Sequence, residues 1–207
     1  MRTQSLRLVL LAILNSIVQF LGVMLWRWPI GNVFLLFWVE NVIITIMSIA
    51  RVAAVPRGDG GELAGKLIAS SVLAIFAVVH GAFTVALALA TGLNLGAAFF
   101  AVPVVVLILR YAVEALGWFG PRAPRPSSID DGYRFALRRI VTLHIAIMAS
   151  WFVLVFGIIR LVQDGGAAAP LGASLPLVAL AILLLAKTVS EISSLRGQAA
   201  VQPAPSP

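Results

Sequence analysis

Long, unbroken apolar segments are the feature that most limits what this chain can fold into. A helix needs about 20 mostly apolar residues to cross a bilayer, and six segments of the sequence qualify. With ends placed to within about two to four residues, they cover 6–25, 29–49, 67–90, 97–118, 137–162 and 173–195. The runs are continuous, whereas barrel strands alternate in polarity and are about ten residues long. We therefore predict an all-α, polytopic membrane helix bundle of six transmembrane helices over residues 1–196, followed by a disordered tail over 197–207.

The composition fits lipid better than water as the solvent for this chain. Hydrophobic residues make up 61% of its 207 residues and charged residues 11%, against about half and a quarter in a soluble domain. The chain has no cysteine, which excludes a disulfide framework, a thiolate metal site and a cysteine nucleophile. It also lacks a P-loop, a Gly-x-Ser-x-Gly elbow and a basic strip interleaved with aromatics. We therefore expect no nucleic-acid partner.

The distribution of Lys and Arg predicts the orientation of the six segments. With six spans, both termini share one side with the loops after residues 49 and 118, and eleven basic residues fall there. The opposite side carries two, Arg27 and Arg160. The positive-inside rule then predicts cytoplasmic termini and a multi-pass protein of the cell inner membrane. The eleven are Arg2, Arg7, Arg51, Arg57, Lys66, Arg122, Arg125, Arg134, Arg138, Arg139 and Arg196.

The expected partner is the lipid bilayer itself, with anionic lipid headgroups at the cytoplasmic arginines. The sequence names no protein partner. The first apolar segment is longer than the apolar core of a signal peptide and no small-residue cleavage site follows it, so we expect an uncleaved helix rather than a signal peptide.

Glu40 is the most informative polar residue inside the apolar segments, where ionisable groups are costly and mark candidate functional sites. It lies near the middle of the second segment. Its neighbour Asn41 begins a polar row with Thr45 and Ser48 at helical spacings of four and seven. The row predicts that the second helix turns a polar face toward the bundle. Packing by a buried, hydrogen-bonded Glu40 is the alternative to a functional role.

Both histidines of the chain also fall inside apolar segments, His80 in the third and His144 in the fifth. With Glu40 they form a set of two histidines and one carboxylate, which suits a divalent metal such as zinc or iron. No His-Glu-x-x-His spacing places two ligands on one helix. The metal site is therefore one hypothesis, and interhelical hydrogen bonding by the histidines is the other.

Two pairs of opposite charge stand at a spacing of four residues, Arg110 with Glu114 and Lys187 with Glu191. Such side chains neutralise each other or extend to the cytoplasmic interface. Lys187 lies deeper, and pairing with Glu40 is an alternative for it.

Short motifs follow one another along the chain in a recognisable order. They are Phe37-Trp38-Val39-Glu40-Asn41-Val42, His80-Gly81-Ala82-Phe83, Arg139-Ile140-Val141-Thr142-Leu143-His144, and Lys187-Thr188 followed by Glu191. In these motifs the chain resembles a family of bacterial integral membrane proteins catalogued as domain of unknown function 6498. That family has a Tyr-Trp-Leu-Glu-Asn-Val type motif, so Phe37 removes one hydroxyl, and Glu191 stands where an Asp is expected. The resemblance implies a multispanning membrane protein and supplies no activity, substrate or cofactor.

The resemblance and the cost of burying polar groups select the same region. The residues that they single out are Glu40, Asn41, His80, Arg139, His144 and Lys187. We predict that Glu40, His80 and His144 converge on one polar pocket open toward the cytoplasm, with Lys187 and Asn41 in its wall. Three classes of function stay open: a metal-dependent intramembrane enzyme, a proton-coupled carrier, and a scaffold or partner subunit whose polar groups only join helices. A dry, fully hydrogen-bonded cluster would indicate the scaffold.

Overall fold

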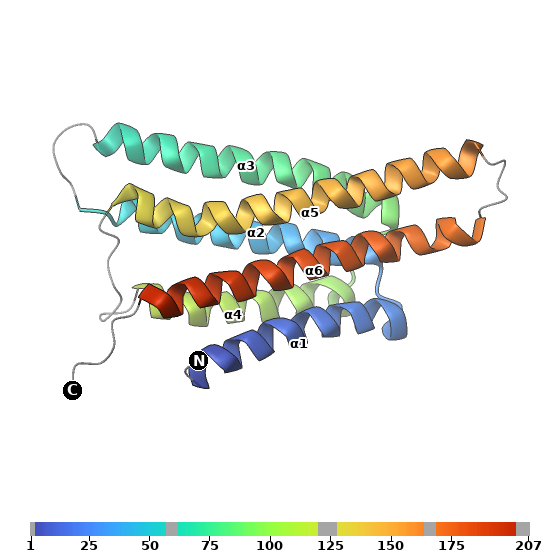
Figure 1. The fold of residues 1–207 in the computed structure, drawn as a ribbon, viewed down its shortest axis with the longest axis horizontal. Coiled ribbons are helices and arrows are strands. Elements are labelled where there is room, and N and C mark those ends of the chain that lie inside the picture. Colours follow the sequence, from blue (N-terminus) through green and yellow to red (C-terminus); the bar gives the residue numbers. More distant parts are fainter. Residues whose placement is uncertain (1–2, 57–61, 120–127, 164–168, 202–207) are drawn as a thin grey trace. The chain divides into compact units, whose positions relative to one another are not determined.

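The computed structural model describes residues 3–56, 62–119, 128–163 and 169–201. All secondary structure within these ranges is helical (Figure 1), which confirms the predicted all-α class for this part of the chain. The elements are α1 (Thr3–Trp26), α2 (Ile30–Ala53), α3 (Glu62–Thr91), the π-helix η1 (Ala97–Ala101), α4 (Val102–Phe119), α5 (Ile129–Gln163) and α6 (Ala169–Val201).

Three of the described helical stretches are long and apolar enough to cross a membrane, by length and composition. They are Ile30–Ala53, Glu62–Thr91 and Ile140–Arg160. The remaining predicted segments correspond to shorter apolar stretches, Ser16–Trp26, Ala97–Ala112 and Ser174–Ser190. Six spans and cytoplasmic termini therefore stay predictions. α6 continues to Val201, past the predicted start of the tail, and residues 202–207 lie outside the described ranges.

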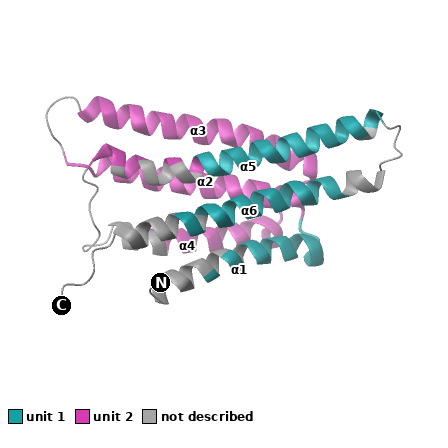
Figure 2. Cartoon of the chain, viewed as in Figure 1, with its two compact units in different colours: residues 1–28, 141–207 teal, residues 29–140 magenta. Residues whose placement is uncertain are grey.

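The chain forms two compact units, coloured separately in Figure 2. Unit 1 consists of residues 1–28 and 141–207, and unit 2 of residues 29–140. Unit 1 therefore holds α1, most of α5, and α6, whereas unit 2 holds α2, α3, η1, α4 and the start of α5.

In unit 2, α2 and α3 lie side by side (Figure 1), and Trp38 on α2 contacts α3. The Trp38 indole Nε1–H donates a hydrogen bond to the carbonyl oxygen of Ala77, at 3.1 Å. The same ring lies over Gly81, where a Cβ atom would sit only 2.7 Å from Trp38 Cε2. A small residue at position 81 thus lets the two backbones approach, as is common where membrane helices pack.

Asn32 ties the beginning of α2 to the connection between α3 and η1. Its side-chain amide donates to the carbonyl oxygens of Asn94, at 2.5 Å, and Phe99, at 3.0 Å. Its Oδ1 accepts from the backbone N–H of Asn94, at 2.8 Å. Next to it, a Cβ atom on Gly31 would collide with backbone carbonyl oxygens at the end of α3. This end of unit 2 therefore depends on close backbone contact.

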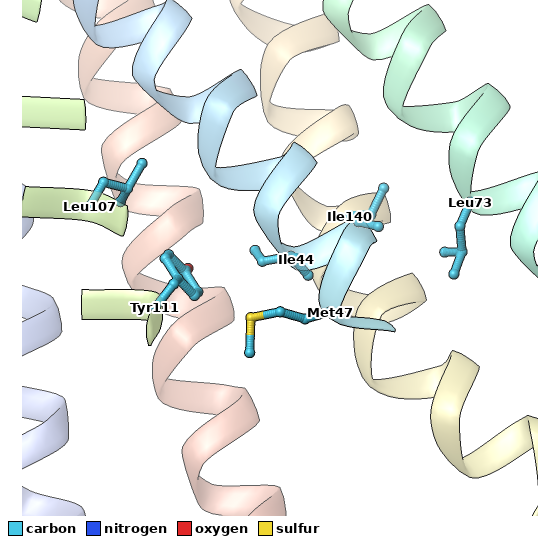
Figure 3. Packing of buried hydrophobic residues seen from close by; sticks show 6 residues of the cluster. All are labelled: Ile44, Met47, Leu73, Leu107, Tyr111 and Ile140. Atoms are coloured by element: carbon cyan, nitrogen blue, oxygen red, sulfur yellow. The ribbon is translucent and has the colours of Figure 1, made fainter. Parts of the chain in front are cut away.

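A hydrophobic cluster fills unit 2 around the second half of α2 (Figure 3). In a bilayer, where lipid is as apolar as these side chains, such a cluster stabilises the fold through close packing. Its buried members are Ile44, Met47, Leu73, Leu107, Tyr111 and Ile140. Tyr111 is the member with a polar end, and its hydroxyl connects this core to the candidate site.

Hydroxyl groups join the helices of unit 1. Thr188 Oγ1 on α6 donates to Ser16 Oγ on α1, at 2.8 Å. Ser150 Oγ on α5 donates to the carbonyl oxygen of Ala179 on α6, at 3.0 Å. Gly157 on α5 lies under the Leu175 side chain, whose Cδ2 would come within 2.7 Å of an added Cβ atom. Polar bonds and a small residue therefore connect the three helices of this unit.

Candidate functional site

Glu40 lies in the middle of α2 with 1% of its surface exposed. Its carboxylate Oε1 accepts a hydrogen bond from the hydroxyl of Tyr111 on α4, at 2.5 Å. Tyr111 is not among the residues predicted for the site. The available signal was its type and place, because it is one of only two tyrosines in the chain and falls inside an apolar segment. A buried tyrosine hydroxyl usually finds a hydrogen-bond partner.

Arg110 adds a cation beside this pair. Its Cζ atom lies 5.5 Å from the centroid of the Tyr111 ring, within the range of a cation–π interaction. The predicted pairing with Glu114 falls on a side chain outside the described residues. The contacts that the structure describes therefore link a guanidinium, an aromatic ring and a carboxylate in that order.

The polar row of α2 is buried, as predicted. Asn41 is 1% exposed, Thr45 4% and Ser48 0%. Four polar atoms of the row have no hydrogen-bond partner among the described residues: Asn41 Oδ1 and Nδ2, Thr45 Oγ1, and Ser48 Oγ. Leaving a buried polar group unsatisfied costs about 1–3 kcal/mol. Since an arrangement of this kind is expensive, the row is a candidate binding surface.

Other buried or half-buried hydroxyls of the helices satisfy themselves locally. Thr84 Oγ1 donates to the His80 carbonyl oxygen at 2.8 Å, and Ser150 Oγ to that of Ala146 at 2.9 Å. This bond to the carbonyl four residues earlier is the usual choice of a helical hydroxyl. Thr45 and Ser48 do not make it within the described structure. Their hydroxyls therefore differ from Thr84 and Ser150 in conformation and not in residue type.

His80 is fully buried on α3, in the same unit as Glu40. Its neighbour Gly81 is the residue covered by Trp38. Two of the motifs that suggested the family resemblance thus meet at the packed boundary of α2 and α3. Trp38 and Gly81 explain the close helix packing, and Glu40, Asn41 and His80 are the buried polar residues of these motifs.

The remaining predicted site residues belong to unit 1 or lie outside the described side chains. Lys187 is 1% exposed on α6, and His144 is half-buried on α5. The side chain of Arg139 is not among those described. The structure therefore groups Glu40, Asn41 and His80 in one unit, and the common pocket stays a prediction.

The structure gives no support for the predicted metal site. Among the described side chains, no group of three or more histidine, aspartate and glutamate residues is arranged to hold a metal ion. The zinc or iron set of Glu40, His80 and His144 therefore stays a prediction.

Helices of this length and apolarity, with a buried carboxylate and a buried polar row, define a membrane-compatible helical protein. The chain matches the model of the Family of unknown function (DUF6498) over residues 2–206. It belongs to this family, which confirms the resemblance seen in the motifs. No curated protein and no solved structure matches the chain.

Proposed function

We propose that this protein is a multi-pass protein of the cell inner membrane that binds a small polar solute on the buried face of α2. The observation that supports the proposal is the set of four partnerless polar atoms on Asn41, Thr45 and Ser48. In the hydrocarbon core each such group is costly to bury until it has a hydrogen-bond partner. A solute that both donates and accepts hydrogen bonds would offset that cost.

Glu40 adds a negative charge to this site. It is the only acidic residue of α2 and lies next to Asn41. Tyr111 donates to its Oε1 and so orients the carboxylate. The site is therefore better suited to neutral or cationic solutes, including a proton, than to anions.

The scaffold alternative accounts less well for the row. Groups that join helices in this protein have partners, as Asn32 and Trp38 do in unit 2. Asn41, Thr45 and Ser48 have none within the described residues, so helix joining does not explain why they are polar. The inner-membrane location and cytoplasmic termini rest on the asymmetry of Lys and Arg.

Thermal unfolding of the full chain in detergent tests the proposal with Ser48→Ala, and Ser150→Ala as the matched control. Both serines are fully buried, but only Ser150 binds another helix. We expect Ser48→Ala to leave Tm unchanged or raise it, and Ser150→Ala to lower it. A loss in Ser48→Ala equal to that in Ser150→Ala would favour the scaffold.

A screen for the solute follows from the same measurement. Small ammonium and guanidinium compounds and neutral polyols are added to the wild-type protein, and stabilisation is scored by the rise in Tm. A solute of this site stabilises the wild type but not Glu40→Gln or Asn41→Leu. Stabilisation that survives both substitutions would place its binding elsewhere.

A further inference from the structure

The chemistry of the partnerless atoms limits which class of solute can bind to the row. All four belong to an amide or a hydroxyl, so the row offers neutral donors and acceptors. Water matches such groups, because it donates and accepts and is held in proteins by two to four polar partners. An anion would need positive charge on the row, and α2 carries none between its beginning and Arg51.

The spacing of the row also fits water. At a rise of about 1.5 Å per residue, Thr45 lies about 6 Å along the helix from Asn41, and Ser48 about 4.5 Å further. One water joined to two groups by hydrogen bonds of about 2.8 Å spans up to about 5.6 Å. Each step of the row is therefore about the length that a single bridging water covers.

Along α2, the row begins directly after a residue that can take up a proton. Glu40 precedes Asn41 directly, and both are 1% exposed. The charged and titratable residues of the elements packed against α2 within unit 2 are Glu62, Lys66 and His80 on α3, Arg110, Tyr111 and Glu114 on α4, and Asp130, Asp131, Tyr133, Arg134, Arg138 and Arg139 at the start of α5. Of these, Tyr111 binds Oε1 of Glu40 through its hydroxyl.

We infer that Asn41, Thr45 and Ser48 bind a file of water molecules along α2, through which Glu40 takes up and releases protons. In the uptake step a hydronium ion passes one proton to a carboxylate oxygen of Glu40, which leaves a neutral carboxylic acid and a water molecule. Release is the reverse step, and no electrons are transferred. Tyr111 is a positioning residue that holds the carboxylate. This inference rests on the proposed function, with water and the proton as the solute.

Infrared spectroscopy of the full chain in phosphatidylcholine vesicles tests the inference. The carboxyl band of protonated Glu40 is assigned by its loss in Glu40→Gln, and its shift is then followed after transfer to heavy water. We expect fast exchange in the wild type, and exchange slowed about tenfold or more in Thr45→Val and Ser48→Ala, because each removes a group that binds the bridging waters. Thr45→Ser should restore the fast rate.

Ser150→Ala and Thr188→Val serve as controls, because they change hydroxyls of unit 1. We expect wild-type exchange in both.

Unchanged exchange in Thr45→Val and Ser48→Ala would overturn the water file, as would the absence of any Glu40-dependent band at every pH at which the protein stays folded. If Ser48→Ala keeps its Tm but exchange is unchanged, only this inference fails. If its Tm falls as in Ser150→Ala, the proposed binding site fails as well. Should Thr45→Val not fold, Ser48→Ala alone decides.

Discussion

Buried hydroxyl groups have different roles in the two units. In unit 1, Ser150 donates to two carbonyl oxygens, on its own helix and on α6, and Thr188 binds both Leu184 and Ser16. In unit 2, Thr45 and Ser48 are also buried, at 4% and 0% exposed, and have no such bonds among the described residues. The same residue types therefore join helices in unit 1, whereas on α2 in unit 2 they lack such bonds, although Thr84 on α3 of unit 2 binds its own helix.

The contrast has one exception in unit 1. Gln19 on α1 is 9% exposed, and its Oε1 has no partner in the described part of the chain. It lies one turn from Ser16, which binds Thr188. A single partnerless atom next to a hydrogen-bonded pair differs from four such atoms on three residues along one helix face.

The largest expected effect compares a glycine of each unit. Gly31→Ala should lower the free energy of unfolding by about 3 kcal/mol or more, because the added Cβ meets backbone carbonyl oxygens that cannot move aside. Gly157→Ala should cost about 1 kcal/mol, because its Cβ meets the flexible end of Leu175. Thermal or denaturant unfolding in detergent measures both. Equal losses would show that the two packed regions are equally rigid.

The next effect concerns the bond between Tyr111 and Glu40. Tyr111→Phe should lower the free energy of unfolding by about 1.5–3 kcal/mol, since it removes a hydrogen bond to a buried carboxylate. Tyr133→Phe is the control, because Tyr133 is only partly buried against the hydrophobic cluster. The double variant with Glu40→Gln should cost less than the two single losses combined. Strict additivity would contradict a direct interaction.

A smaller effect distinguishes the hydroxyls themselves. Thr188→Val should lower the free energy of unfolding by about 0.6 kcal/mol, the average for hydrogen bonds between membrane helices. Thr45→Val keeps the shape of the side chain and removes a hydroxyl without a partner in the described residues, so stability should hold or rise. The comparison uses Tm in the same detergent. A larger loss in Thr45→Val would reverse the contrast between the units.

The last comparison concerns two backbone positions with positive φ, one in each unit. Arg27 follows α1 with φ 54°, and Gly92 follows α3 with φ 91°. A residue with a Cβ atom pays about 1–2 kcal/mol for this conformation. Arg27→Gly should therefore raise the free energy of unfolding by up to about 1 kcal/mol, and Gly92→Ala should lower it. A loss on Arg27→Gly would mean that its side chain stabilises the turn.

The helices and the buried row could be predicted from local pattern. The second apolar segment, predicted at 29–49, lies almost wholly within α2, and the spacing of Asn41, Thr45 and Ser48 predicted a buried face. The limits of α3 and α5 were harder to predict. A search for apolar segments finds only the part of a helix that is suited to lipid. Both helices begin earlier than the predicted segments, α3 at Glu62 and α5 at Ile129, because their first turns are more polar.

The sequence by itself determined which groups are expensive to bury, because that cost depends on residue type and on whether the spacing along the helix places the residue on a buried face. It identified Glu40, the row and His80 in this way. Only the tertiary structure decided which of those groups have partners. The bond from Tyr111 to Glu40 joins residues 71 positions apart, and the hydroxyls of Thr45 and Thr84 differ only in the direction that packing gives them. Hydrogen bonds depend on distance and angle, and helix packing sets both.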